Sequence, residues 1–195
     1  NTAAGTIDAA GVVTGIAAGT TTISYVTANG CFETLTVTVN NLPSVITGGT
    51  TVCENSTTTL SSTPPGGTWS SSTPATGTVN GGGVVTGLSA GTTTITYTSA
   101  AGCIRTTVVT VNARPAAFTP TTNALCVGAT ITYSSTPTGG TWTSSNATNA
   151  SIGSATGLMT GNNAGTATIT YTHPTNGCLR MRNITVNPLP ATIGG

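Results

Sequence analysis

Five cysteines are the residues whose chemistry and spacing are most informative in this sequence. Cys31, Cys103 and Cys178 each follow a glycine and lie 72 and 75 residues apart (103−31, 178−103), and Cys53 and Cys126 lie 73 apart (126−53). Two cysteines in each unit of a β-rich chain of the secreted type favour disulfide bonds. A metal site is less favoured, because no cluster of histidine or acidic side chains accompanies the cysteines.

The other groups that could carry out chemistry are few and scattered. His173 is the single histidine, and the acids Asp8, Glu33 and Glu54 lie in separate places. No two carboxyl groups can act together as acid and base, and no serine has both a histidine and an acid in its own unit. The cluster of oxygen ligands that calcium requires is also missing. We therefore expect no enzyme activity, no catalytic residue, no metal ion and no cofactor.

The charge content argues against two classes of partner. Only 4% of the 195 residues are charged, the net charge is +1, and the four arginines form no patch. Nucleic acids and anionic membrane surfaces attract clustered lysine or arginine, so neither is expected as a partner. No apolar run reaches the length of a membrane span, so no membrane insertion is expected in this sequence.

The sequence repeats with a period of about 72–75 residues. Tyr25, Tyr97 and Tyr171 recur at intervals of 72 and 74 (97−25, 171−97), and each unit closes with a Val-Asn segment before a proline. Two units also contain matching early halves, "VCENSTTTLSSTPPGGTWSSS" and "LCVGATITYSSTPTGGTWTSS". The predicted domains are the C-terminal half of a repeat in 1–43, complete repeats in 44–115 and 116–190, and the start of a further repeat in 191–195.

The strand pattern within a repeat is regular. No segment shows the helical period of 3.6, and the abundant threonine and valine favour strands because they are β-branched. In 92–98, Thr93, Ile95 and Tyr97 alternate with other threonines, so one face of the strand should be buried and the other wet. Seven short strands in about 72 residues fit a sandwich of two sheets. The fold class is therefore all-β, with tandem β-sandwich repeats arranged head to tail. The aromatic residues expected in the cores are Trp69, Trp142, Tyr25, Tyr97 and Tyr171.

Several motifs resemble the bacterial immunoglobulin-like repeat of group 2, the invasin/intimin-related kind. That pattern combines a W-S-S segment, a G-x-V-x-G turn and a G-T-x-x-I-x-Y strand. Here these are 69–71, 83–87 and 91–97, and the first and last recur at 142–144 and 165–171, while the turn has degenerated to "GLMTGNNAG". The resemblance implies immunoglobulin-like sandwiches. The Thr- and Gly-rich, two-cysteine version is similar to repeats of large Bacteroidota surface adhesins and gliding fibres.

The resemblance leaves two disulfide pairings open. The Cys…Trp…Cys order of an immunoglobulin-like unit favours bonds within repeats, Cys53–Cys103 and Cys126–Cys178. In that topology, however, the turns beside Cys53 and Cys103 lie at opposite poles, whereas bridged Cα atoms lie within about 7 Å. In a head-to-tail array one pole meets the next repeat, so Cys53 could bond Cys178 instead. Cys31, Cys103 and Cys126 would then have partners outside this sequence or in other units.

The expected function is that of a structural stalk or filament repeat in a secreted or cell-surface bacterial adhesin or extracellular fibre, reinforced by disulfides. Its partners would be neighbouring repeats of the same chain and, in a fibre, other copies of it. The expected location is extracellular, at the cell surface or secreted. The alternative is an adhesin module that binds carbohydrate or protein, since Trp69 and Trp142 could stack on sugars if they are exposed rather than buried.

Overall fold

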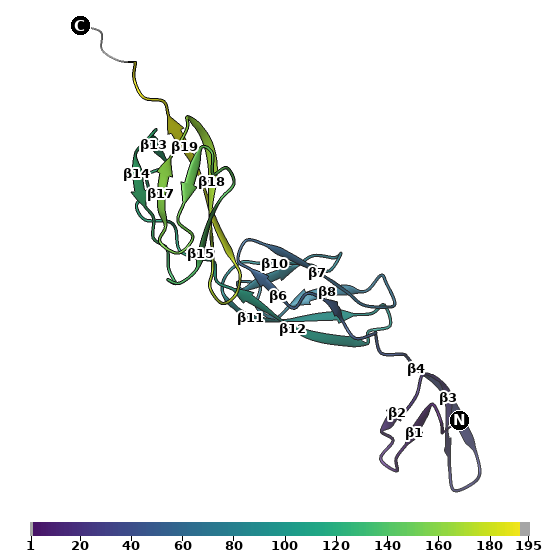
Figure 1. Cartoon of the computed structure of the whole chain (residues 1–195). Coiled ribbons are helices and arrows are strands. Elements are labelled where there is room, and N and C mark those ends of the chain that lie inside the picture. Colours follow the sequence, from purple (N-terminus) through teal and green to yellow (C-terminus); the bar gives the residue numbers. More distant parts are fainter. Residues whose placement is uncertain (1, 192–195) are drawn as a thin grey trace. The chain divides into compact units, whose positions relative to one another are not determined.

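The computed structural model describes residues 2–191, and these residues form strands and turns with no helix (Figure 1). Residues 2–43 contain β1 (Gly5–Ile7), β2 (Val13–Gly15), β3 (Gly19–Val26) and β4 (Phe32–Val39). Residues 44–115 contain β5 (Thr47–Gly48), β6 (Thr51–Cys53), β7 (Thr57–Ser61), β8 (Thr68–Ser71), β9 (Gly77–Val79), β10 (Val84–Gly87), β11 (Gly91–Thr98) and β12 (Ile104–Asn112). Residues 116–190 contain β13 (Ala124–Cys126), β14 (Thr130–Thr132), β15 (Thr141–Ser144), β16 (Ala150–Ile152), β17 (Leu158–Gly161), β18 (Gly165–Thr172) and β19 (Leu179–Asn187).

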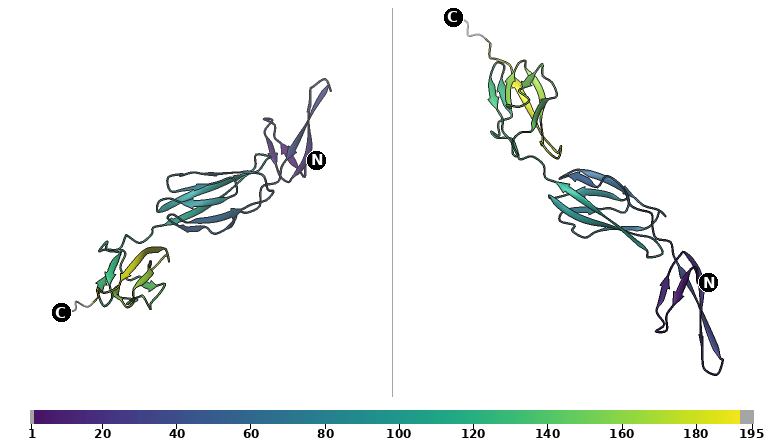
Figure 2. Two further views of the ribbon diagram at one scale, coloured as in Figure 1. Left: turned by 90° about the horizontal axis from the view of Figure 1, so that it is seen from above. Right: turned by 60° about the horizontal axis from the view of Figure 1, so that its bottom comes forward.

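Each complete repeat is a sandwich of two sheets. In 44–115 the sheets have the strand orders β5-β7-β10-β9 and β6-β12-β11-β8, and in 116–190 they are β13-β19-β18-β15 and β14-β17-β16. Figure 2 shows the strands of each repeat from two further sides. The core of 116–190 lies between its sheets, because Met159 of β17 and Ala150 of β16 join Ile169 of β18 and Ile184 of β19 in one buried cluster. The all-β fold with tandem sandwich repeats is therefore confirmed. The predicted start of a further repeat, 191–195, lies outside the described residues apart from Ala191.

The described residues fall into two compact units whose limits do not follow the repeats. The first unit includes the residues up to Thr51, Thr57–Thr86 and Thr92–Thr110. The second includes Val52–Ser56, Gly87–Gly91 and the residues from Val111 onward. One pole of the repeat 44–115, which carries Cys53, thus belongs to the same unit as the repeat 116–190.

The threonine ladder of β11 alternates as its sequence predicts. Ile95 and Tyr97 are buried, whereas the threonines that alternate with them, at 94, 96 and 98, are partly exposed. Thr93 lies on the inner face and is buried as well, so its hydroxyl needs partners. It shares a hydrogen bond of 2.7 Å with the Ser71 hydroxyl and accepts another of 3.1 Å from the Thr73 N–H. β-Branched threonine can therefore occupy both faces of this strand, provided that the inner hydroxyl is hydrogen-bonded.

A tyrosine on the long central strand of each complete repeat fastens the turn before the tryptophan strand. The Tyr171 hydroxyl accepts a hydrogen bond of 2.7 Å from the Gly140 N–H and donates one of 2.6 Å to the Pro137 carbonyl. Tyr97 makes the equivalent bonds in 44–115. A Cβ on Gly140 would lie 2.2 Å from the Thr172 carbonyl oxygen and 2.4 Å from the Tyr171 ring, so only glycine fits at this position.

The prediction that Tyr25 lies in a core is wrong for this structure, in which Tyr25 is 74% exposed. Its counterpart Tyr97 is 2% exposed and packs on Trp69 with ring centroids 4.7 Å apart. Residues 2–43 contain no tryptophan strand of this kind, so nothing equivalent to Trp69 covers Tyr25. Phe32, the residue after Cys31, is also exposed, at 69%, as are its counterparts Ile104 and Leu179 in the complete repeats.

Tyr171→Phe tests whether the buried hydroxyl supports the sandwich. The change leaves the Gly140 N–H and the Pro137 carbonyl without their partner, and we expect it to lower the free energy of unfolding by about 1–3 kcal/mol. Urea unfolding followed by tryptophan fluorescence measures the effect. Tyr25→Phe is the matched control and should change stability by less than about 0.5 kcal/mol, because that ring is exposed. Equal losses in both variants would contradict the assignment.

Candidate functional site

A disulfide bond joins Cys53 to Cys178 and marks the candidate site. Cys53 ends β6, and Cys178 lies in the turn between β18 and β19. Their Cα atoms are 5.7 Å apart although 125 residues separate them in the sequence. Both belong to the second compact unit. We call the surrounding segments 53–56, 112–114 and 176–179 the stapled junction.

The pairing in the structure is the one between repeats, and the alternative pairings Cys53–Cys103 and Cys126–Cys178 are absent. The reason is the length of β12. Cys53 lies at the end of this strand, because the Glu54 N–H bonds the Asn112 carbonyl at 3.0 Å, whereas Cys103 comes just before its first residue. Nine extended residues span about 30 Å, far beyond the roughly 7 Å that a disulfide allows between Cα atoms.

The remaining three cysteines are free thiols in the structure. Cys31 and Cys126 are exposed, and Cys103 is partly buried. Their participation in disulfides stays a prediction.

The charged residues Glu54 and Arg114 make further hydrogen bonds beside the disulfide. The Glu54 carboxylate accepts hydrogen bonds from the backbone N–H groups of Ala90, at 2.9 Å, and Arg114, at 3.2 Å. The Arg114 guanidinium in turn donates through Nε to the Leu179 carbonyl at 3.0 Å. Both side chains are partly buried, so these bonds are partly shielded from water. The pair links the pole of one repeat to the residue that follows the cysteine of the next.

Asn176 orients the turn that presents Cys178. Its side-chain oxygen accepts a hydrogen bond from the Cys178 N–H at 2.9 Å, and its Nδ2 donates to the Ala113 carbonyl at 3.1 Å. Gly177 between them has a φ of 71°, in the left-handed region that glycine adopts without strain. The turn is thus shaped by Asn-Gly and fixed to the segment that leaves β12.

Sequence reasoning identified the cysteines but missed Glu54, Arg114 and Asn176. A usable signal was present, since Glu54 and Arg114 are two of only seven charged residues (four basic, three acidic). In a chain this poor in charge, each ionic group is a candidate for a specific contact. Their proximity was hidden because 60 residues separate them in the sequence.

The predicted core aromatics of the complete repeats form clusters. Trp142 is 4% exposed and lies 4.6 Å from Tyr171 and 4.8 Å from Phe118, measured between ring centroids. The Arg182 guanidinium lies over the Phe118 and Tyr133 rings at 5.2 and 5.5 Å. Burial raises the pKa of Tyr133, and the hydrogen bond and positive charge of Arg182 oppose that rise. Trp69 in 44–115 is only half-buried.

The described residues offer few groups for metal binding or membrane crossing. No set of three or more histidine, cysteine, aspartate or glutamate side chains within 2–191 is arranged to hold a metal ion. Within the same residues, no helix is long and apolar enough to cross a membrane.

Comparisons with solved structures give matches at low sequence identity. Domains 4 and 5 of the S-layer protein SbsC match at 18% identity, covering 77% of this chain and 100% of that one, with a TM-score of 0.38. A fragment of intimin bound to the translocated intimin receptor matches at 14% identity over 75% of this chain and 64% of that one, with a TM-score of 0.45. Invasin, an integrin-binding protein, matches at 16% identity over 90% and 46%, with a TM-score of 0.45. No curated protein matches the chain.

The successive two-sheet sandwiches define the molecule as a tandem array of immunoglobulin-like β-domains. The family model described as bacterial Ig-like domain (group 2) matches residues 31–111 and 106–178. The chain belongs to this family.

Digestion with trypsin under non-reducing conditions tests the pairing directly. Trypsin cuts after Arg105 and Arg180 but not after Arg114, which precedes a proline, so it yields fragments 1–105 and 106–180. After free thiols are alkylated in denaturant, the Cys53–Cys178 bond should hold these fragments together until a reductant is added.

The control is Cys178→Ser, which should release the two fragments without reduction. Fragments of the unaltered chain that separate before reduction would contradict the structure, because the within-repeat pairings keep each bond inside one fragment.

Proposed function

We propose that the chain is part of a structural stalk or filament, in a secreted or cell-surface bacterial protein, whose repeats are fastened to one another by disulfides. The observation that carries this proposal is the bond between Cys53 of one repeat and Cys178 of the next. A disulfide inside a domain stabilises that domain, whereas a disulfide between successive domains restricts their separation. Restricting separation is useful in a protein that transmits tension along its length.

The bond determines which part of the chain would carry a pulling force. Tension applied at the two ends passes along the backbone to Cys53, crosses the sulfur atoms and continues from Cys178. Residues 54–177 are bypassed, and they include all strands from β7 to β18. Hydrogen-bonded sheets of marginal stability therefore need not resist the load, because a covalent bond carries it.

The other three cysteines are proposed to continue the same pattern with further repeats. Cys126 has the backbone setting of its counterpart Cys53: the next residue, Val127, donates to Asn187 at 2.9 Å, as Glu54 donates to Asn112 at 3.0 Å. Each late cysteine also lies in the same kind of turn, in which its carbonyl accepts a backbone bond across the turn. These bonds are Thr27 to Cys31, Ser99 to Cys103 and His173 to Cys178, at 2.8, 2.9 and 2.8 Å. An early cysteine would thus bond the late cysteine of the following repeat.

The proposed arrangement keeps the domain boundaries 1–43, 44–115, 116–190 and 191–195. It also favours a location outside the cytoplasm, because structural disulfides persist in oxidising compartments. Membership of a large Bacteroidota adhesin or gliding fibre is the specific form of this proposal, and the repeat sequence is its support. Partners would be adjacent repeats and, in a fibre, other copies of the chain.

Single-molecule stretching of the full chain, held at its two ends, tests the load path. The oxidised chain should not release the length between the linked cysteines, which is about 410–450 Å because 125 residues extend by about 3.3–3.6 Å each. Adding a reductant should make that length available, in one or two further unfolding steps.

The control variant Cys53→Ser/Cys178→Ser should release this length without reductant. If the oxidised wild-type chain extends as far as this variant, the disulfide does not limit extension and the proposed stalk role fails. An unchanged circular-dichroism spectrum would show that the variant retains its strands.

A further inference from the structure

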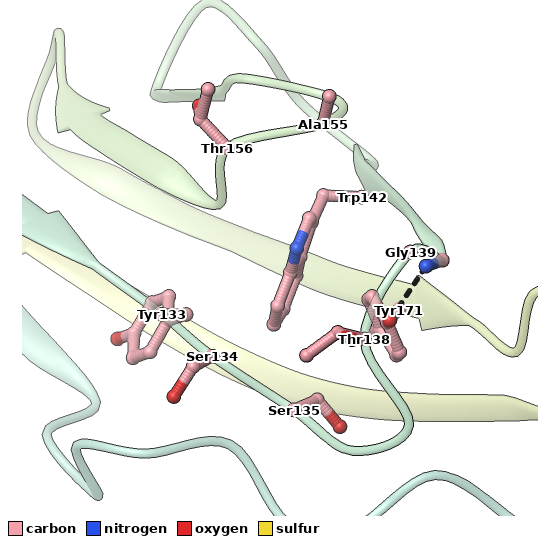
Figure 3. Close-up of a pocket in the computed structure, with 10 residues that line it drawn as sticks. Tyr133, Ser134, Ser135, Thr138, Gly139, Trp142, Ala155, Thr156 and Tyr171 are labelled. Carbon is pink, nitrogen blue, oxygen red and sulfur yellow. Dashed lines mark hydrogen bonds between the residues drawn. The ribbon is translucent and has the colours of Figure 1, made fainter.

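The two complete repeats carry equivalent pockets beside their tryptophans, and the pockets differ in volume and in how far the tryptophan is covered. Figure 3 shows the pocket of 116–190, in which the Trp142 ring lies between Tyr133 and Tyr171 and a loop with Ala155 and Thr156 passes above it. Trp142 is 4% exposed. Neighbouring protein groups therefore cover nearly all of its surface.

In 44–115 the covering residues are smaller. Aligning the repeats on their Ser-Ser-Thr-Pro segments places Leu60 at the position of Tyr133, and aligning them on Pro43 and Pro115 places Ile46 at the position of Phe118. The loop that passes above the tryptophan has Gly81 and Gly82 where the other repeat has alanine and threonine. The cavity is correspondingly larger, about 220 Å³ compared with about 150 Å³. As a result, Trp69 is half-buried and lines an open cleft.

The walls of this cleft are rich in exposed backbone and carry no charge. Four glycines line it, and an added Cβ on Gly66 or Gly81 would meet no atom within 4 Å. Within residues 2–191, no hydrogen bond uses the peptide N–H of Gly66 or of Gly81. The Tyr97 hydroxyl at the base is already committed to Gly67 and Pro64. The cleft is therefore lined by neutral groups, and they include two residues whose peptide N–H groups have no hydrogen-bond partner within residues 2–191.

We propose that the cleft over Trp69 binds a single neutral hexopyranose ring. The C–H bonds on one face of a pyranose carry partial positive charge and pack on the negative face of an aromatic ring, while its hydroxyl groups bond to peptide groups. Uncharged walls suit a neutral sugar, and the volume lies below the about 300–1,000 Å³ of pockets for larger ligands. This binding site is independent of the stalk role, although repetition along a fibre would raise its avidity.

A titration of the ¹⁵N-labelled full chain with the methyl glycosides of glucose, galactose and mannose tests the site by NMR. The two tryptophan indole N–H signals report on the two pockets separately. We expect the Trp69 indole and the Gly66 and Gly81 amides to shift in a saturable way, with Kd on the order of 1–10 mM because a single ring offers only about 12 heavy atoms. The Trp142 indole should not shift.

The matched variant is Gly81→Ala/Gly82→Thr, which gives the cleft over Trp69 the two loop residues of the smaller pocket beside Trp142. This variant should bind the methyl glycosides at least tenfold more weakly than the unaltered chain does. The fold should be preserved, because a Cβ at Gly81 meets nothing within 4 Å, a Cβ at Gly82 approaches only the Asn80 side chain at 3.4 Å, and neither glycine has a positive φ. An unchanged Trp142 signal and melting temperature would verify this.

Three results would overturn the proposal. They are the absence of saturable shifts with all three glycosides, equal shifts of both indole signals, and undiminished binding by the loop variant. Saturation by a proline-rich peptide but not by the glycosides would likewise reject the sugar in favour of a peptide ligand.

Discussion

The length of the last strand is the constraint on which the disulfide arrangement depends. β12 and β19 each extend over nine residues, and each repeat has one cysteine near the start of this strand and one near its end. The two cysteines of one repeat are therefore held about 30 Å apart by a hydrogen-bonded strand that cannot shorten. A cysteine at one pole can form a bond only with a group that another repeat brings to that pole, as Cys178 does for Cys53.

The noncovalent bonds at the stapled junction explain how Cys178 is kept in place. The Asn176 side chain donates to the Ala113 carbonyl, and the Arg114 side chain donates to the Leu179 carbonyl. Both bonds end on backbone atoms, so they hold segments 112–114 and 176–179 together without depending on the side chains of Ala113 and Leu179. Arg114 has leucine at the corresponding positions of the other units, Leu42 and Leu189. The side-chain contact of Arg114 with the Leu179 carbonyl is therefore particular to this junction.

The sequence predicts the sandwiches well because their information is local. Alternation in β11 specifies which side chains are buried, and the glycines before the tryptophan strand are required by a tyrosine on the same sheet. The cysteine pairing, Glu54 and Arg114 could not be assigned in the same way, because they depend on how successive repeats meet. The prediction that Tyr25 is buried was wrong for a related reason. Its local sequence matches that of Tyr97, but burial also needs a partner strand that 2–43 does not contain. The different exposures of Trp69 and Trp142 likewise arise from substitutions at distant positions of the repeat.

Disulfides between successive repeats, as proposed, would limit extension under tension more than disulfides within each repeat would. An internal bond protects its own loop, but tension still passes through every strand outside it. When each early cysteine bonds the late cysteine of the next repeat, successive loops overlap, since Cys126 lies inside the loop closed by Cys53 and Cys178. The shortest covalent path along such a fibre crosses one disulfide to a late cysteine. It then follows the backbone only as far as the next early cysteine, where it crosses the next disulfide. The backbone between a late cysteine and the next early cysteine is 22 or 23 residues long here (53−31, 126−103). Only this stretch would carry tension for every two repeats, each of which has 72–75 residues. A fibre of this kind would be nearly inextensible although each sandwich is only marginally stable.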